Sequence, residues 1–109
     1  MSEVEFHSVA RKDEVPNGDI LEVFVGDYEI ALYGLDGEIY ATDAICTHAY
    51  ARLIDGYVED GQIECPAHSG SFDIRTGKVI REPCTEPLRT YPVKIDGDTV
   101  LVGLPKPAG

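Results

Sequence analysis

Hydrophobic and polar residues follow one another in short runs, and glycine-containing dipeptides typical of tight turns separate the runs. These dipeptides are Gly26-Asp27, Asp36-Gly37, Asp60-Gly61, Thr76-Gly77 and Asp96-Gly97. The runs between them are rich in Val, Ile, Leu and Tyr, a composition that favours strands. The pattern predicts strands over residues 6–10, 20–25, 28–35, 38–42, 62–64, 71–73, 78–80, 88–95 and 99–104.

Several of these runs alternate between apolar and polar residues, which predicts strands with one buried face. Residues 29–32 and 91–95 are examples. Only residues 11–15, which Pro16-Asn17-Gly18 terminates, resemble a helical turn, and no segment suits a helix of several turns. Short strands at regular intervals with turn signals between them predict an all-β antiparallel sandwich or barrel.

The chain has 109 residues, the length of one domain. Residues 44–55 and 66–70 interrupt the strand pattern and read as two loops, with a hairpin over 57–64 between them. We therefore expect a small subdomain, about 44–84, inserted into a β base. Residues 105–109 read as a loosely ordered tail.

The formal net charge of −11 argues against nucleic acid and anionic membranes as partners, and the acidic excess is concentrated in residues 1–45. No apolar run reaches the length of a membrane span, and the N-terminal residues carry neither the basic nor the apolar region of a signal peptide. Three cysteines, two of them in a metal motif, fit a reducing compartment. We expect a soluble, cytoplasmic protein with no membrane contact.

The chemistry of the chain is concentrated in two short motifs, Cys46-Thr47-His48 and Cys65-Pro66-Ala67-His68. Two thiolates and two imidazoles suit either a tetrahedral zinc or an iron–sulfur centre. One Cys-His pair on each of two neighbouring loops, in a chain of strands, favours a Rieske [2Fe–2S] centre, in which two histidines replace two cysteines. The alternatives are a structural zinc module and a cluster-free Rieske-fold subunit, although all four ligands are intact. Cys84, between Pro83 and Pro87, reads as a passive thiol in a loop over the cluster and not as a fifth ligand. His7 reads as a surface residue of the first strand.

The two motifs and their surroundings resemble a known family. With residues 69–73, 76–77, 29–33, 37–42, 55–57 and 90–94, they are similar to the ferredoxin components of bacterial aromatic-ring-hydroxylating dioxygenases, of the naphthalene and biphenyl dioxygenase type. The resemblance implies one Rieske [2Fe–2S] cluster held by Cys46, His48, Cys65 and His68. It also implies a monomeric one-electron carrier that is not itself an enzyme and has no catalytic residue.

The same resemblance implies two partners. A flavoprotein reductase that uses NAD(P)H would supply the electron, and the Rieske centre of a terminal oxygenase would accept it. Both would dock transiently at the tip formed by His48 and His68, where Tyr50 and Arg52 are our candidate contacts. The alternative function is that of a Rieske small subunit in another multicomponent redox enzyme.

Departures from the wider Rieske family predict a low reduction potential. Ala51 and Ala67 stand where respiratory Rieske proteins carry a disulfide. Gly70 and Phe72 stand where high-potential members carry hydroxyl groups that donate to cluster sulfurs. Because fewer donors stabilise the reduced cluster less, we expect a potential near the low end of the Rieske range, about −150 mV. A further departure is Ala49-Tyr50, since dioxygenase ferredoxins usually have glycine after the first histidine.

Overall fold

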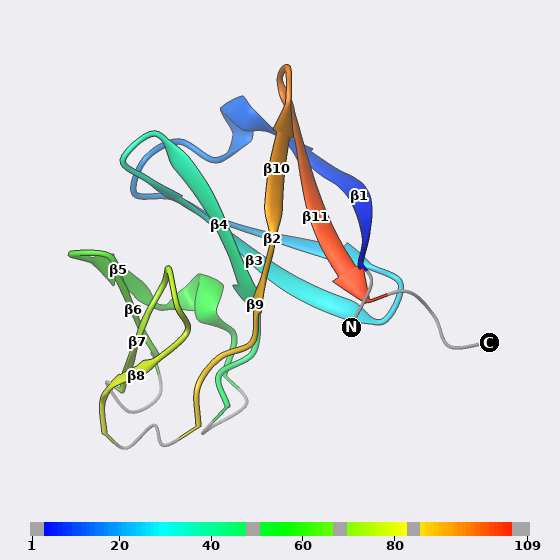
Figure 1. Cartoon of the computed structure of the whole chain (residues 1–109). Coiled ribbons are helices and arrows are strands. Elements are labelled where there is room, and N and C mark those ends of the chain that lie inside the picture. The colour runs from blue at the N-terminus through cyan, green and yellow to red at the C-terminus, as the bar shows by residue number, and fades with distance from the viewer. Residues whose placement is uncertain (1–3, 48–50, 67–69, 83–85, 106–109) are drawn as a thin grey trace.

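The computed structural model describes residues 4–47, 51–66, 70–82 and 86–105 and confirms the all-β prediction (Figure 1). The described strands form three antiparallel sheets, which we name the terminal sheet (β1-β11-β10), the central sheet (β2-β3-β4-β9) and the inserted sheet (β5-β6-β7-β8). Their bounds are β1 Val4–Arg11, β2 Ile20–Val25, β3 Tyr28–Leu35, β4 Glu38–Asp43, β5 Tyr57–Glu59, β6 Gln62–Glu64, β7 Ser71–Asp73, β8 Val79–Arg81, β9 Thr90–Tyr91, β10 Val93–Asp96 and β11 Thr99–Pro105, with 3₁₀ turns η1 Lys12–Glu14 and η2 Leu53–Asp55. In the described part of the chain, no helix is long and apolar enough to cross a membrane.

Strand β3 of the central sheet is buried on both faces, contrary to the prediction of one buried face for residues 29–32. The residues of this strand are buried from Ile30 to Leu35. Ile30 and Leu32 lie on one face and pack in a core with residues of β11, whereas Ala31 and Tyr33 lie on the other face, in a second core with residues of the inserted sheet. The polar Glu29 had suggested alternation, but every later position of the strand is apolar or glycine. Apolar side chains on both faces of one strand thus join three sheets into one structure.

The buried side chains form two hydrophobic cores. The base core lies between the terminal and central sheets and comprises Val15, Ile30, Leu32, Ile39, Ala41, Tyr91, Val100, Val102 and Leu104. The interface core lies between the central and inserted sheets and comprises Ala31, Tyr33, Leu35, Ala44, Cys46, Leu53, Ile63, Cys65, Phe72, Ile74 and Leu88. Both cysteines of the predicted centre therefore belong to the core that attaches the inserted sheet to the rest of the molecule.

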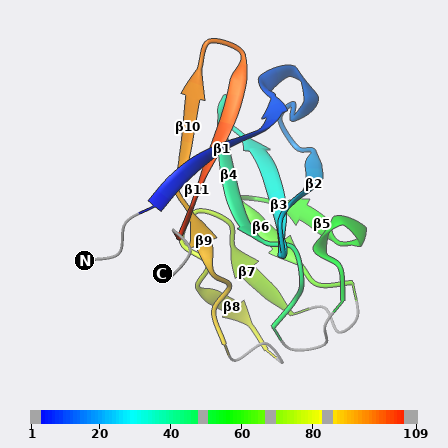
Figure 2. The same cartoon turned by 90° about the vertical axis from the view of Figure 1, so that its right-hand side faces the viewer.

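Strands from near the two ends of the sequence close the base. β1 pairs antiparallel with β11, from Val4 opposite Pro105 to Arg11 opposite Thr99, with an irregularity between Ser8 and Ala10. The inserted sheet leaves the base after β4 and returns to it at β9, and Figures 1 and 2 show it below the base in both views. This arrangement supports a subdomain of about 44–84, whose exact limits remain our proposal.

The single strand predicted over 88–95 is wrong, because Pro92 divides it. β9 ends at Tyr91 and pairs with β4 of the central sheet, whereas β10 begins at Val93 and pairs with β11 of the terminal sheet. Proline has no amide proton to donate to a ladder. The carbonyl of Pro92 still accepts a hydrogen bond from the amide of Gly103 (2.9 Å), so the chain crosses between the two sheets at this residue.

The other strands lie where the sequence predicts them or shifted by one or two residues, and the hairpin at 57–64 is β5 and β6. The helical turn expected in 11–15 is η1. The second turn, η2 at Leu53–Asp55, lies within residues 44–55, for which the sequence predicts a loop, so this part of the prediction is wrong. Its Leu53 is fully buried, and a single apolar residue of this kind gives too short a pattern to reveal a 3₁₀ turn.

Candidate metal centre

The first cysteine stands at the top of a short two-stranded stem. Ile45 and Arg52 form an isolated antiparallel bridge. The Cys46 amide donates to the carbonyl of Ala51 (2.8 Å), and the Leu53 amide donates to the carbonyl of Ala44 (2.9 Å). These bonds close residues 46–51, which we name the first ligand loop, at its base.

The second cysteine lies in a loop closed in the same way. The Cys65 amide donates to the carbonyl of Gly70 at 2.7 Å, immediately between the end of β6 and the start of β7. We name residues 65–70 the second ligand loop. In both loops the cysteine amide bonds to the carbonyl of the fifth residue after it. The two loops thus have the same length and the same closing bond, and each encloses one of the predicted histidines in sequence.

Both cysteines are buried in the interface core, with exposed fractions of 0 % for Cys46 and 1 % for Cys65. The segments of His48 (48–50) and His68 (67–69) lie outside the described residues, as do Ala67, Tyr50 and Cys84, so the geometry of the four predicted ligands as a set is not described. Two thiols presented by matching loops to one apolar core fit a cluster that needs soft sulfur ligands and shelter from water. The described donors therefore fit the predicted group.

The positions that would carry hydroxyl groups in a high-potential centre are apolar and buried. Phe72 is fully buried on the inner face of the inserted sheet, opposite Ile63 of β6. Gly70 is also buried. The neighbouring Ser71 does have a hydroxyl, but this group donates to Gln62 Oε1 (3.3 Å). The position where the sequence analysis expects a hydroxyl donor in a high-potential centre therefore holds a buried ring, and the low potential stays a prediction.

Glu86, at the end of a proline-rich segment, contacts the first ligand loop, and the predicted role of this segment as a cover for the cluster stays a prediction. The hydroxyl of Thr47, between Cys46 and His48, donates to the carbonyl of Glu86 (2.8 Å). Glu86 follows the segment that contains Cys84. The contact places the far end of this segment against the ligand loop, and the passive role of Cys84 itself stays a prediction.

Two tyrosines, Tyr33 and Tyr91, form hydrogen bonds at the end of β4 that the sequence did not reveal. Tyr33 and Thr42 hydroxyls are 2.8 Å apart, and Thr42 donates its proton to the carbonyl of Asp43 (2.8 Å), so Tyr33 is the donor to Thr42. Tyr91 donates to the Asp43 carboxylate. Burial raises the pKa of Tyr33, and burial together with the Asp43 carboxylate raises the pKa of Tyr91. Both phenols stay protonated and hold the end of β4, from which the first ligand loop follows.

Arg52, a predicted docking contact, binds carboxylates of the same chain. Its Nη2 lies 3.0 Å from Glu22 Oε1 and 3.2 Å from Glu29 Oε1. The guanidinium lies 5.9 Å from the centre of the Phe24 ring. These contacts raise the pKa of Arg52, first through the hydrogen bond to Glu22 and then through that to Glu29. The side chain is 40 % exposed, so contact with a partner stays a prediction, but the structure gives Arg52 an internal function that the sequence did not indicate.

Comparison with known proteins identifies the family. Residues 5–92 match the model of the Rieske [2Fe-2S] domain. The chain is 52 % identical over 91 residues to the ferredoxin component of the naphthalene 1,2-dioxygenase system of Pseudomonas aeruginosa, covering 84 % of this chain and 88 % of that protein. It is 40 % identical over 104 residues to the biphenyl dioxygenase ferredoxin subunit of Pseudomonas sp. (strain KKS102), covering 94 % of this chain and 95 % of that protein.

Solved structures agree with this assignment. The Sphingomonas yanoikuyae B1 ferredoxin has a TM-score of 0.88 at 39 % identity, over 93 % of this chain and all of that one (100 %). A ferredoxin in a complex of reduced oxygenase and oxidized ferredoxin in carbazole 1,9a-dioxygenase has a TM-score of 0.86 at 33 % identity, over 95 % and 97 % of the two chains. The chain therefore belongs to the Rieske [2Fe–2S] family, among the ferredoxin components of aromatic dioxygenase systems, and its cofactor is a Rieske-type [2Fe–2S] cluster.

Proposed function

We propose that this chain is the one-electron carrier of an aromatic-ring dioxygenase system, which accepts an electron from an NAD(P)H-dependent flavoprotein reductase and delivers it to the Rieske centre of a terminal oxygenase. The observation that carries the proposal is the pair of identically closed cysteine loops in one buried core. Identity of 52 % to a ferredoxin component of a naphthalene 1,2-dioxygenase system supports it. No catalytic residue is assigned to the chain.

The proposed ligands are Cys46 and Cys65 with His48 and His68. The bound cluster supplies reversible one-electron chemistry. The chain's own residues hold the ligand thiols in an apolar core, which excludes water from the sulfur atoms, and the two closing hydrogen bonds fix the backbone of each cysteine. A fixed ligand backbone limits the rearrangement that accompanies a change of charge.

We place the docking surface at the tip that carries His48 and His68, in a monomeric, cytoplasmic protein. A ferredoxin related to this chain occurs in a complex with the oxygenase of carbazole 1,9a-dioxygenase, which supports the oxygenase as one partner. The reductase as the second partner follows from the proposed function. Tyr50 remains the candidate contact at the tip, and Arg52 is a weaker one because its guanidinium already binds two carboxylates.

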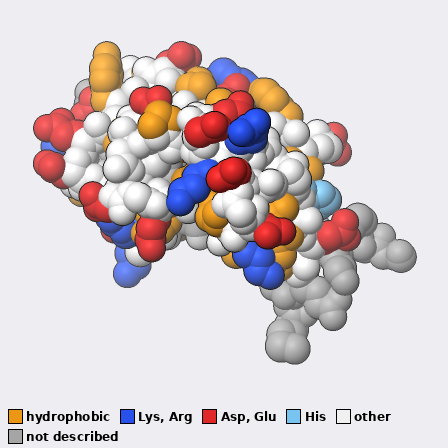
Figure 3. Space-filling view, turned by 90° about the horizontal axis from the view of Figure 1, so that it is seen from above, with side chains coloured by type: hydrophobic (Ala, Val, Ile, Leu, Met, Phe, Trp, Pro, Cys, Tyr) orange, Lys and Arg blue, Asp and Glu red, His pale blue; other side chains and the backbone are white. Residues whose placement is uncertain are grey.

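The negative charge of the protein suggests that electrostatic attraction contributes to partner recognition. The end of the molecule seen from above in Figure 3 carries many Asp and Glu side chains and fewer Lys and Arg. We expect the net charge of −11 to orient the carrier toward basic partner surfaces. The rate of association with its reductase should then fall as ionic strength rises, and a rate independent of salt would remove this part of the proposal.

An EPR-monitored redox titration with iron and zinc analysis tests the proposed function. A rhombic Rieske signal near the low end of the family range, together with electron delivery to a dioxygenase oxygenase in single-turnover mixing, is the expected result. Zinc in place of iron would refute the carrier function. A Rieske signal from a protein that purifies only in a tight stoichiometric complex would instead favour a subunit of another multicomponent redox enzyme.

A further inference from the structure

Two arginines join the inserted sheet and its loops to the central sheet, and their contacts are closely similar. Arg52 binds Glu22 of β2 and Glu29 of β3 at 3.0 and 3.2 Å and lies beside the Phe24 ring. Arg75 binds Asp36 at 3.0 Å, and its guanidinium lies 5.4 Å from the centre of the Tyr40 ring.

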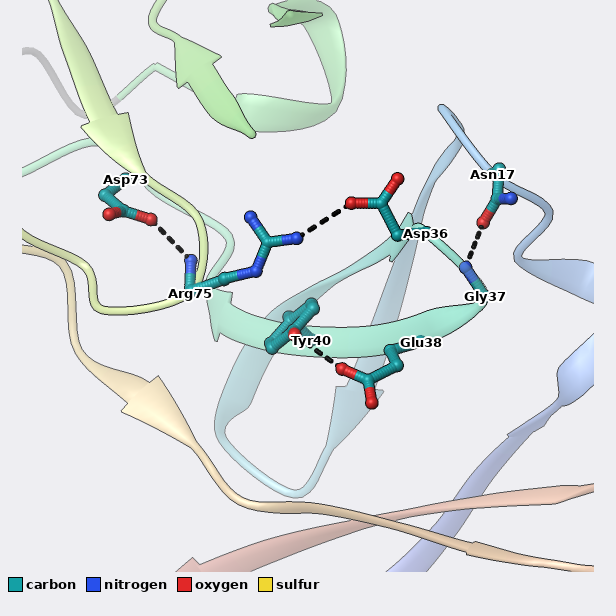
Figure 4. A network of polar contacts seen from close by, with 7 residues as sticks. All are labelled: Asn17, Asp36, Gly37, Glu38, Tyr40, Asp73 and Arg75. Atoms are coloured by element: carbon teal, nitrogen blue, oxygen red, sulfur yellow. Dashed lines mark hydrogen bonds and ion pairs between the residues drawn. The ribbon is translucent and has the colours of Figure 1, made fainter. Parts of the chain in front are cut away.

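The two arginines occupy different ends of the same interface. Arg52 belongs to the stem of the first ligand loop, directly after Ala51, which accepts the hydrogen bond of the Cys46 amide. Arg75 belongs to the turn between β7 and β8, where its amide donates to Asp73 Oδ1 (2.9 Å) and its guanidinium reaches the turn between β3 and β4 (Figure 4). That turn lies at the end of the inserted sheet away from the ligand loops (Figure 1).

The burial of Glu22 makes the Arg52 contact difficult to break. The Glu22 side chain is only 14 % exposed, and its Oε2 is buried without a hydrogen-bond partner among the described residues. Its Oε1 accepts from Arg52. Without the guanidinium, a largely buried carboxylate would lose this charged donor, and such a loss is unfavourable. By contrast, Asp36, the partner of Arg75, is 87 % exposed and can be solvated by water when its pair opens.

We propose that Arg52 is a positioning residue that fixes the stem of the first ligand loop to the central sheet through Glu22 and Glu29, so that Cys46 is held in place from outside its own loop. The proposal rests on the proposed ligation by Cys46 and His48. Arg75 joins the end of the inserted sheet that lies away from the ligand loops to the central sheet. This contact contributes to stability but does not position the first ligand loop.

The test compares Arg52→Met with Arg75→Met in the purified, cluster-loaded protein. Both changes keep a long apolar stem and remove one cation; Arg52 loses two ion pairs, at 3.0 and 3.2 Å, and Arg75 loses one, at 3.0 Å. We would measure cluster loss to an excess of iron chelator by visible absorbance, hydrogen exchange of the Cys46 amide, and the thermal unfolding midpoint. Hydrogen exchange reports local opening separately from global unfolding.

We expect Arg52→Met to accelerate both cluster loss and exchange of the Cys46 amide by about fivefold, the order of effect of removing two partly exposed ion pairs. Arg75→Met should lower the unfolding midpoint slightly, because Asp36 is 87 % exposed, and should leave both rates within about twofold of the unmodified protein. Equal effects of the two variants on the Cys46 amide, or no effect of Arg52→Met, would overturn the proposal.

Glu29→Gln provides a milder variant if Arg52→Met does not fold. It removes one of the two pairs of Arg52 and leaves Glu22 in place, and we expect about a twofold acceleration of both rates. Unchanged rates in Glu29→Gln would then count against the proposal. Absence of iron from the unmodified protein would refute the proposed function instead, so the two failures are distinguishable.

Discussion

Replacing Phe72 by tyrosine tests the origin of the expected low potential. Phe72 is fully buried in the interface core that also contains Cys46 and Cys65. The resemblance to the Rieske family implies that high-potential members have an aromatic hydroxyl at this position. If the ring edge faces the sulfur atoms of the centre, the added hydroxyl becomes a donor to a group that gains negative charge on reduction, and the potential rises.

The size of the effect follows from the charge dependence of hydrogen bonds. A hydrogen bond to a charged group contributes about 1.5–3 kcal/mol, against about 0.5–1.5 kcal/mol between neutral groups. The reduced state therefore gains about 1 kcal/mol more than the oxidised state, equivalent to about +40 mV for a one-electron couple. If instead the hydroxyl meets only the apolar side chains of this core, a buried unsatisfied group costs about 1–3 kcal/mol of stability. In a chain of this size the unfolding midpoint would then fall by at least about 4 °C.

The assay is a redox titration of Phe72→Tyr beside the unmodified protein, with thermal unfolding of both. Phe72→Leu is the control, because it perturbs packing at the same position and adds no donor. A rise of about 40 mV in the tyrosine variant alone, with little loss of stability, is the expected result. An unchanged potential with a lower midpoint, or an equal rise in the leucine variant, would refute the reasoning.

Two further predictions concern a buried phenol and a turn. Because burial raises the pKa of Tyr33, the folded chain keeps a proton that the unfolded chain loses above about pH 10, so stability falls as pH rises beyond that value. Urea titrations between pH 8 and 11 measure this fall, and Tyr33→Phe should reduce it to the part that Tyr91 contributes. An unchanged dependence of stability on pH would contradict the assignment to Tyr33. Gly77 has φ +77° and a Cβ there would lie 2.2 Å from the Leu88 carbonyl oxygen, whereas Gly97 has φ +62° and open space around it. We expect Gly97→Ala to cost about 1–2 kcal/mol and Gly77→Ala distinctly more in urea unfolding, and equal losses would show that the contact with Leu88 relaxes freely.

Local sequence signals explain how much of the fold could be predicted. Strands bounded by glycine turns, such as β2 and β3, have the predicted limits because each turn dipeptide stops the apolar run on both sides. The division of the chain at Pro92 depends on which sheet each half joins, and this is a property of the pairing with β4 and β11. The second buried face of β3 depends likewise on the inserted sheet that packs against it.

Local sequence signals likewise predicted only part of the candidate site. Ligand type and spacing indicate Cys46 and Cys65, because thiolates and imidazoles in short motifs have few other uses in a reducing compartment. The equal spacing of the closing carbonyls, at Ala51 and Gly70, was present in the sequence but has meaning only once the bonds are seen. The contact of Arg52 with Glu22 joins residues 30 positions apart, so no local pattern contained it.

The pairing of β1 with β11 has a consequence for the order of events during synthesis. Phe6 lies opposite Gly103, so β1 obtains its ladder partner only after the chain has been made through β11. Such distant contacts carry a large loop-closure cost and slow the folding of β-rich domains. The segments with Cys46 and Cys65 leave the ribosome well before the base can close, and they remain the part of a nascent, incomplete protein in which thiols are accessible to oxidants and stray metals. We therefore expect both cysteines to be accessible for cluster insertion before the base closes.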